Sequence, residues 1–329
     1  QGFWAKLKRP IVAIAPMANV TDAAFRQMFV ECGKPDVFWT EFVSVEGLLS
    51  KGKEHLLVDF WHTEAEHPIV AQILGAKPEQ FEQVATMIAE LGFDGIDINM
   101  GCPDRGVEKQ GAGAALIKNP KLAKEIIKAT HRGAKGLPIS IKTRIGYSKN
   151  QIEEWIPHLL EENIAALTIH LRTRNEMSDV PAHWEFAHNI VILRDRLAPD
   201  TLLLGNGDLY TLDETQKKIE KSRMDGAMIG RGIFGNPWFF SGHIPTAEER
   251  LTRMVEHVEL FEKLYKSNLD KKEGALKNFD IMKKHFKAYV TSFDDARELR
   301  ILLMETKNAT EVRTITEAFL SSHFMLQQS

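Results

Sequence analysis

The sequence predicts a (β/α)8 TIM barrel followed by a small all-helical C-terminal domain. Eight short apolar segments rich in β-branched residues recur between residues 10 and 232, and amphipathic stretches separate them. Nearly continuous apolar strands that alternate with helices indicate parallel strands covered on both faces. Eight such units are typical of a closed barrel. An open doubly wound sheet remains the alternative, because the spacing of the segments does not prove closure.

The expected strands are bounded by clear helix signals. Between the third and fourth strands, Phe81, Val84 and Ile88 fall at helical spacing, Pro78 lies near the helix start and Gly92 ends the helix. The eight expected strands cover residues 10–17, 36–41, 68–75, 94–101, 138–144, 165–172, 201–208 and 225–232.

The pattern changes near residue 244. Residues 246–329 carry helical periodicity and no convincing strand. We therefore expect a catalytic barrel over residues 1–244 and a separate helical domain over residues 245–329.

The composition is that of an ordinary globular protein. The chain has 329 residues and a formal net charge of -3, so its overall charge gives no sign of nucleic-acid binding. The two cysteines, Cys32 and Cys102, argue against a disulfide framework and favour a reducing, cytoplasmic location. No apolar run approaches the roughly 18 residues of a membrane span, and the N-terminus lacks the apolar core of a signal peptide. No membrane association is expected.

Polar residues or glycines follow nearly every expected strand. The carboxyl ends of barrel strands carry the active site in this architecture. A lone His170 would more often be structural, and a lone Lys142 would more often lie at the surface, but residues of this kind at all eight exits indicate a ligand site. The residues at the exits are Pro16, Met17, Ala18, Glu41, Gln72, Asn99, Cys102, Lys142, Arg144, His170, Arg172, Arg174, Asn206, Gly207, Asp208, Gly230 and Arg231.

The chemistry of these residues suits a flavin mononucleotide. The segment GRGIFG (230–235) matches a dinucleotide fingerprint but follows the last strand, where a barrel builds its phosphate site. Asn206 and Asp208 would bind hydroxyl groups, and Gln72 offers a donor and an acceptor to a heterocycle edge. Lys142 would place positive charge beside a reduced ring. The same residues could also bind another phosphorylated ligand.

Seven motifs in this chain resemble those of the tRNA-dihydrouridine synthase family, in the family's order. They are APMANVTDAAFR (15–26), INMGCP (98–103), KQGAGAALIKNP (109–120), IKTRIGY (141–147), IHLRTR (169–174), GNGD (205–208) and GRGIFGNPW (230–238). The resemblance implies an FMN-containing barrel, a helical RNA-binding domain and a catalytic cysteine at Cys102. It also implies FMN contacts from Pro16, Met17, Ala18, Gln72, Lys142, His170, Asn206, Gly207, Asp208, Gly230 and Arg231.

The implied reaction reduces the C5=C6 bond of a uridine in tRNA to dihydrouridine, with NADPH or NADH as the reductant. The Cys102 thiol would donate a proton as a positioned general acid, whereas Cys32 lacks such a context and is interpreted as a packing residue. No metal is expected, and the protein is expected to be a monomer.

A uracil within folded RNA must be extruded while the backbone around it is held. Near the strand exits the expected RNA contacts are Asn99, Arg105, Lys109, Arg144, Arg172 and Arg174. Lysines also outnumber acids in the segment 263–287, which is consistent with phosphate contact. The expected contacts there are Lys271, Lys272, Lys283 and Lys284, and the interleaved aromatic residues are interpreted as a core stripe.

One segment departs from the family pattern. After HLRTR the family usually has an aromatic residue and a glycine before an Asp/Glu–Trp/Tyr pair, whereas this chain has NEMSDVPAHW (175–184). The departure leaves open the target nucleotide and the choice between tRNA and rRNA. The alternatives are a small-molecule FMN barrel of dihydroorotate dehydrogenase type and a non-enzymatic RNA-binding scaffold. The lysine-rich tail argues against the first, and Cys102, Lys142 and His170 together argue against the second.

Overall fold

The computed structural model describes residues 2–266 and 276–323. Contacts between residues divide the chain into two compact units. The first unit contains residues 1–18 and 35–231, and the second contains residues 19–34 and 232–329. Residues 19–34, which lie within the predicted barrel range 1–244, therefore belong by their contacts to the second unit.

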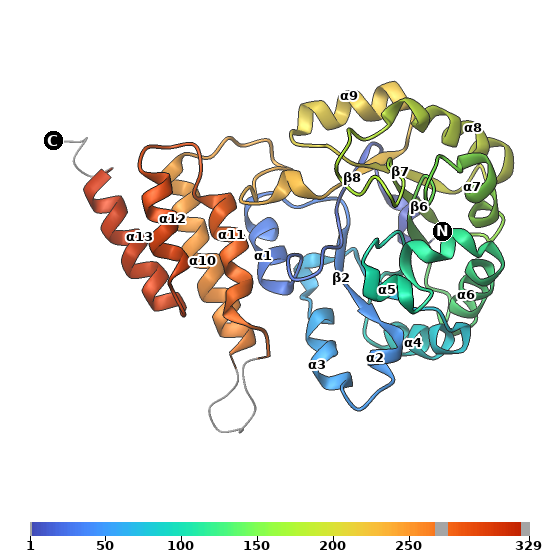
Figure 1. The fold of residues 1–329 in the computed structure, drawn as a ribbon, viewed down its shortest axis with the longest axis horizontal. Helices are drawn as coiled ribbons and strands as arrows, with labels where there is room; N and C mark the ends of the chain where they lie inside the picture. Colours follow the sequence, from blue (N-terminus) through green and yellow to red (C-terminus); the bar gives the residue numbers. More distant parts are fainter. Residues whose placement is uncertain (1, 267–275, 324–329) are drawn as a thin grey trace. The chain divides into compact units, whose positions relative to one another are not determined.

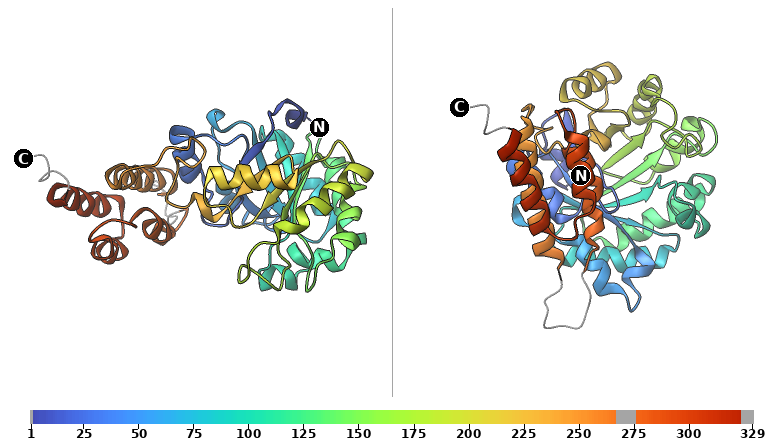
Figure 2. Two further views of the ribbon diagram at one scale, coloured as in Figure 1. Left: turned by 90° about the horizontal axis from the view of Figure 1, so that it is seen from above. Right: turned by 60° about the vertical axis from the view of Figure 1, so that its left-hand side comes forward.

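The first unit is built on a single sheet of eight parallel strands (Figures 1 and 2). The strands follow the order β1-β8-β7-β6-β5-β4-β3-β2, and a parallel bridge between Ala13 and Val37 joins the two ends of that order. The (β/α)8 barrel predicted from the sequence is confirmed. The strands are β1 (Ile11–Ile14), β2 (Phe38–Ser44), β3 (Ile69–Leu74), β4 (Gly95–Met100), β5 (Ile139–Arg144), β6 (Ala166–His170), β7 (Leu202–Asn206) and β8 (Gly226–Ile229).

Helices cover the outer face of this sheet (Figure 1). Helix α4 (Pro78–Glu90) is representative, since it begins at a proline and buries Phe81, Val84 and Ile88. The other helices of this unit are α2 (Val45–Leu48), α3 (Lys53–Leu57), α5 (Arg105–Lys109), α6 (Pro120–Gly133), α7 (Ile152–Leu160), α8 (Ala187–Leu197) and α9 (Leu212–Ser222). Short 3-10 turns are η1 (Gly2–Lys6), η2 (Val58–Phe60), η3 (Glu64–Glu66), η4 (Gly113–Lys118), η5 (Trp184–Phe186) and η6 (Arg231–Ile233), the last of which crosses into the second unit.

Burial on both faces of the sheet explains why the strands are apolar throughout. Every residue of β1, β3 and β4 is buried. Trp4 of η1 packs against Trp39 of β2, with ring centroids 5.8 Å apart, in a buried cluster that also contains Leu204 and Met228. Apolar burial of this kind is the main stabilising contribution to such a core.

The register of the strands places the predicted polar residues beside one another. Asn99 of β4 is the partner of Lys142 of β5. Arg144 at the end of β5 is the partner of His170, and His170 is in turn the partner of Asn206. Because all eight strands run in the same direction, these residues meet at the carboxyl edge of the sheet.

The second unit is helical in the described part of the chain. Helix α10 (Ala247–Tyr265) packs against α1 (Ala23–Cys32), α11 (Met282–Tyr289) and α13 (Ala309–His323), and α12 (Ala296–Met304) packs against α11 and α13. The turn η7 (Phe279–Ile281) precedes α11. The hydroxyl of Tyr265 accepts a hydrogen bond from the backbone N–H of Ala23 at 3.1 Å, and Glu31 pairs with Arg253. These contacts attach α1 to the helical unit.

Several aromatic residues of this unit lie in its core. Phe286 and Tyr289 are fully buried, as the interpretation of a core stripe requires, whereas Phe279 is only partly buried. Phe25 of α1 packs against the rings of His257 and His285. Burial lowers the pKa of His257 to about 3, so this ring is neutral within the apolar core.

Among the described residues, no helix combines the length and the apolar character that crossing a membrane would require.

A buried ion pair joins helix α8 to the amino end of β8. Arg194 donates from Nη1 to Asp225 Oδ2 and to the carbonyl oxygen of Thr201, both at 2.6 Å. Asp225 also accepts the backbone N–H of Leu203 at 2.8 Å and pairs with Arg9 at 2.6 Å. Arg194 and Asp225 are only 7% and 6% exposed. This site lies at the amino ends of the strands, where polar residues typically serve stability.

Replacing Arg194 with alanine should therefore destabilise the protein without affecting the opposite edge of the sheet. Removal of one partner from a buried ion pair typically costs about 3–5 kcal/mol, and the remaining contacts of Asp225 with Arg9 and Leu203 place the expected loss toward the lower end of that range. Urea denaturation should show this loss for Arg194→Ala. The matched control is Arg196→Ala, an exposed arginine of the same helix, which should change stability by less than about 0.5 kcal/mol. Equal effects of the two variants would contradict a structural role for the buried pair.

Candidate active site

A pocket opens at the carboxyl ends of β1 and β5 to β8. It encloses about 630 Å³ of space not filled by protein atoms, its opening to solvent included. Nine of the eleven predicted FMN contacts line it, and Ala18 and Gln72 do not. The lining residues are Ala15, Pro16, Met17, Lys142, His170, Arg172, Ser178, Asn206, Gly207, Asp208, Leu209, Tyr210, Met228, Gly230 and Arg231.

Lys142 and Asn206 form an oriented polar pair on the pocket wall. Lys142 Nζ donates to Asn206 Oδ1 at 3.3 Å, and Asn206 Nδ2 donates to the carbonyl oxygen of Met228 at 2.8 Å. The two bonds fix which side of the amide faces the lysine. Burial, reinforced by the charge of Arg144, lowers the pKa of Lys142 to about 8. Lys142 thus remains mostly charged at neutral pH.

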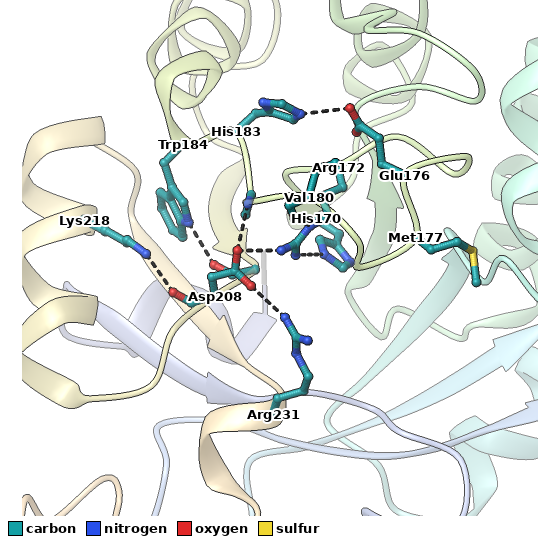
Figure 3. Close-up of polar contacts among 12 residues, drawn as sticks. His170, Arg172, Glu176, Met177, Val180, His183, Trp184, Asp208, Lys218 and Arg231 are labelled. Carbon is teal, nitrogen blue, oxygen red and sulfur yellow. Dashed lines mark hydrogen bonds and ion pairs between the residues drawn. The ribbon is translucent and has the colours of Figure 1, made fainter.

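Asp208 is the centre of the network on the other side of the pocket (Figure 3). Its carboxylate accepts hydrogen bonds from Arg172 at 2.5 Å, from Arg231 at 2.7 Å and from the backbone N–H of Ala182 at 2.8 Å. Burial alone would raise the pKa of Asp208, but these hydrogen bonds and charges outweigh it and hold the pKa below its ordinary value. Asp208 is therefore ionised and links two arginines.

The backbone at this point is unusual. Asp208 has φ of 49° and Gly207 has φ of 123°, both in the left-handed region. A Cβ atom at Gly207 would lie 2.7 Å from the Cβ atom of Ala182, so glycine is required at this position by both conformation and space. Strained backbone of this kind concentrates at ligand sites.

His170 is neutral, and its tautomer follows from its partner. Arg172 Nη1 lies 3.0 Å from His170 Nε2. Because a guanidinium can only donate, Nε2 accepts and Nδ1 carries the proton. Burial, and next the charge of Arg144, lower the pKa of His170 well below its ordinary value. His170 therefore lines the pocket as an uncharged imidazole ring.

A chain of buried side chains supports the turn that carries Cys102. Asn99 Oδ1 accepts the backbone N–H of Cys102 at 2.9 Å, and Asn99 Nδ2 donates to Gln72 Oε1 at 3.0 Å. Gln72 Nε2 donates to Asp97 at 2.6 Å, and Ser140 donates to the same carboxylate at 2.5 Å. Burial raises the pKa of Asp97 to about 6. Gln72 and Asn99, expected as ligand contacts, are thus engaged with one another and with the cysteine turn.

Asp97 is not among the site residues expected from the sequence, although the sequence contains a signal for it. Asp97 and Asn99 are separated by two positions in an apolar strand, so their side chains share one face. A carboxylate within a buried strand requires partners, and Gln72 is its neighbour in the sheet register.

The Cys102 thiol is held in its protonated form. Burial is the main reason that its pKa is raised above the ordinary value, and the charges of Arg144 and Lys142 act in the opposite direction. The net rise means that the sulfur carries its proton at neutral pH. A protonated thiol in a fixed turn is suited to proton donation.

Two of the arginines expected to hold RNA are buried in the structure. Arg144 donates to the carbonyl oxygens of Gly101 at 2.9 Å and of Thr173 and Met177, both at 3.1 Å. Arg172, only 2% exposed, donates to Val180 O at 2.6 Å as well as to Asp208. Both side chains hold the loops around the pocket in place.

The other expected RNA contacts are distributed between the two units. Arg105 and Lys109 of α5 and Lys284 of α11 are exposed. Lys283 is partly buried and pairs with Asp280 at 2.7 Å. Arg174 pairs with Glu108. The remaining two expected contacts, Lys271 and Lys272, lie outside the described residues.

The segment 175–184, which departs from the family pattern, borders the network around Asp208 (Figure 3). Ser178 lines the pocket, and Trp184 donates from Nε1 to the carbonyl oxygen of Gly207 at 2.8 Å. His183 contacts Glu176 at 3.0 Å and Glu185 at 2.9 Å. Burial would lower the pKa of His183, but the two carboxylates outweigh it and raise the pKa. The protonated form of His183 thus stabilises this segment through its ion pairs with Glu176 and Glu185.

This contact should make the segment more mobile as the pH rises. A histidine whose folded pKa is raised contributes stability that is fully present below the unfolded value of about 6.5 and is lost as the pH passes the folded pKa. Hydrogen exchange of residues 175–184, corrected for the intrinsic rate, should therefore accelerate through that window. His183→Gln should remove the pH-dependent part, while His188→Gln, at an exposed site in the first turn of α8, should keep it. An identical profile in parent and His183→Gln would exclude the role of His183.

Within residues 2–266 and 276–323, no three His, Cys, Asp or Glu side chains are grouped so that they would hold a metal ion.

Comparison with known proteins agrees with this architecture. A sequence model of the family described as "Dihydrouridine synthase (Dus)" matches residues 13–324. A Staphylococcus aureus (strain Mu50) protein named "Probable tRNA-dihydrouridine synthase" is 43% identical over 323 residues, which cover 97% of this chain and 96% of the relative. A Bacillus subtilis (strain 168) protein named "Probable tRNA-dihydrouridine synthase 2" is also 43% identical over 323 residues, covering 97% of each chain.

Solved structures support the barrel fold. A structure of morphinone reductase in complex with tetrahydroNAD has a TM-score of 0.50 and 15% identity, covering 72% of this chain and 87% of that chain. A structure of histamine dehydrogenase from Rhizobium sp. 4-9 has a TM-score of 0.53 and 10% identity, covering 75% of this chain and 48% of that chain. At such identities the likeness concerns the fold alone. The family model and the two relatives concern nearly the whole length of the sequence, and the chain therefore belongs to the dihydrouridine synthase family.

Proposed function

We propose that this protein reduces specific uridines in tRNA to dihydrouridine, with FMN as the bound cofactor and NADPH or NADH as the reductant. One observation carries the proposal: a protonated, rigidly held Cys102 and a cationic pocket occupy the same edge of the barrel, in a chain of this family. The names of the two relatives support tRNA as the substrate class. A cytoplasmic, monomeric enzyme is part of the same proposal.

The residues of the pocket fit FMN. Arg231 and the backbone at Gly230 would hold the phosphate, where a barrel typically places such a group. Asn206 and Asp208 would bind the hydroxyl groups, and Lys142 would lie beside the ring system. When bound, FMN supplies hydride transfer from the reduced nicotinamide to C6 of the uracil.

Cys102 would complete the reduction by donating its proton to C5. The raised pKa of the thiol keeps the proton available at neutral pH. After donation the sulfur is a thiolate, which the positive charges of Arg144 and Lys142 stabilise. Asn99 holds the backbone N–H of Cys102, which limits the movement of the turn that carries the thiol.

We assign RNA contact to cations of both units. Arg105 and Lys109 lie on α5, directly after Cys102 in the chain, and would contact the backbone near the extruded base. Lys284 of the helical unit, with Lys271, Lys272 and Lys283 of the same unit, would contact phosphates elsewhere. Arg144 and Arg172 serve this function indirectly through the loops that they hold.

The proposal is tested by supplying the purified protein with FMN, NADPH and an unmodified tRNA transcript. Dihydrouridine should form, as detected by mass spectrometry. Cys102→Ala should keep the flavin and its reduction by NADPH but lose about 10²–10⁴-fold in uridine reduction, the usual contribution of a general acid. Cys32→Ala, in α1 of the helical unit, is the matched control and should retain the parent rate. A near-parent rate in Cys102→Ala would refute the role of the thiol, and a parent inactive on tRNA would refute the substrate.

Arg231→Ala should weaken the binding of FMN. A hydrogen bond to a charged group typically contributes about 1.5–3 kcal/mol, which corresponds to a loss of roughly tenfold or more in affinity. Fluorescence titration of the apoprotein with FMN measures the change. Lys221→Ala, an exposed lysine at the end of α9, should bind FMN as the parent does. Unchanged affinity in Arg231→Ala would mean that the phosphate lies elsewhere in the pocket.

A further inference from the structure

We infer that the ion pair between Arg174 and Glu108 is a positioning device that holds the Cys102 turn for proton donation. The inference rests on the proposed function for its catalytic meaning. Arg174 follows β6, whereas Glu108 belongs to α5, the short helix that follows Cys102. The pair therefore connects the cysteine loop, which follows β4, to the segment after β6, on the far side of β5 in the sheet.

The guanidinium of Arg174 contacts the cysteine loop at two places. Arg174 Nε donates to Glu108 Oε2 at 2.8 Å, and Nη2 makes a second, shorter contact to the same oxygen. Nη2 also donates to the carbonyl oxygen of Pro103, the residue after Cys102, at 3.2 Å. One side chain thus fixes both the peptide next to the cysteine and the helix that follows it.

The pair is shielded from solvent, which strengthens it. The side chains of Arg174 and Glu108 are only 17% and 10% exposed. The Arg174 guanidinium lies 5.7 Å from the centre of the Tyr147 ring, which restricts its orientation. Charge pairs in such surroundings are screened less by water and salt than pairs at the surface.

Glu108 depends on Arg174 for its stability in this position. Its other carboxylate oxygen, Oε1, is buried and has no hydrogen-bond partner among the described residues. Loss of Arg174 would leave a largely buried carboxylate without compensation. We expect α5 to move until Glu108 reaches water, and Cys102 to move with it.

The remaining supports of the turn act on its other side. Arg144 holds the carbonyl oxygen of Gly101 at 2.9 Å, and Asn99 holds the backbone N–H of Cys102. The carbonyl oxygen of Cys102 accepts the backbone N–H of Ala114 at 2.9 Å. Arg174 adds the hold on the segment after the cysteine, where the chain turns into α5.

The expectation from the sequence was that Arg174 contacts RNA phosphate. The two roles are separable by experiment. A phosphate contact acts on RNA affinity and on its salt dependence. A positioning residue acts on the rate at saturating RNA and on the chemical reactivity of the Cys102 thiol. The engagement of Arg174 with Glu108 and Pro103 favours positioning.

The test is a double-mutant cycle of Glu108→Ala and Arg174→Ala in a Cys32→Ala background, where Cys102 is the remaining thiol. Two readouts are needed: the pH profile of alkylation of Cys102 by iodoacetamide, and the single-turnover rate of uridine reduction at saturating tRNA. Each single variant should shift the alkylation profile and lower the rate by roughly 10- to 100-fold, since a displacement of about 1 Å can cost 10²-fold. The double variant should be no slower than the slower single variant, because the two residues act as one unit.

Two controls separate positioning from other effects. Lys109→Ala, an exposed residue of the same helix, should weaken tRNA binding and leave the alkylation profile unchanged. Glu108→Gln keeps the shape of the side chain and a hydrogen-bond acceptor for Arg174, so it should fold as the parent does and lose less rate than Glu108→Ala. All variants should retain FMN.

Additive losses in the cycle would overturn the inference. So would an Arg174→Ala variant with reduced tRNA affinity but an unchanged alkylation profile and single-turnover rate, since Arg174 would then be an RNA contact. If the parent makes no dihydrouridine while the alkylation profiles still shift together and non-additively, the proposed function fails and the positioning of Cys102 by the ion pair stands.

Discussion

The parallel register of the sheet is the constraint on which the site depends. Because the strands pair in register, Asn99 lies beside Lys142, and Arg144, His170 and Asn206 follow one another across three strands. No long loop is needed to gather these groups. The loops then have a different task, which is to hold Cys102 and the cover of the pocket at fixed positions over this edge.

Several positive charges lie close together at this edge, and their mutual repulsion and loss of hydration destabilise the fold. Hydrogen bonds and ion pairs with the surrounding structure offset this loss of stability. After burial, the positive charges of Lys142, Arg144 and Arg172 near His170 lower its pKa further, and the ring remains neutral. Arg172 is compensated by Asp208, and Arg144 donates to three carbonyl oxygens. Buried charges retained in this way, at the expense of stability, are typical of functional sites rather than of structural cores. The same fields lower the pKa of Lys142 and stabilise negative charge in the pocket.

The strands and most of the pocket could be predicted from the sequence, because both follow from local pattern and from the rule that strand ends carry the site. The packing of α1 with the helical unit could not be predicted, because the apolar face of α1 could pack equally well against the barrel or against the other helices. The burial of Arg144 and Arg172 could not be predicted either. The sequence does not distinguish an arginine after a strand that faces solvent from one that donates hydrogen bonds to carbonyl oxygens. The hydrogen bond between Gln72 and Asp97 could not be predicted either, because the two residues lie on different strands and meet only through the sheet register.

The segment 175–184 illustrates how a departure from a family motif is compatible with the fold. Three of its anchors are backbone atoms: the carbonyl oxygens of Met177 and Val180 and the N–H of Ala182. Backbone anchors are available to almost any sequence, so the side chains that make no contact of their own, unlike those of Glu176, His183 and Trp184, are free to vary. Ser178 lines the pocket and Met177 is exposed near it. Sequence variation in this segment therefore alters the surface beside the pocket, while the arginines and Asp208 keep the pocket residues in place.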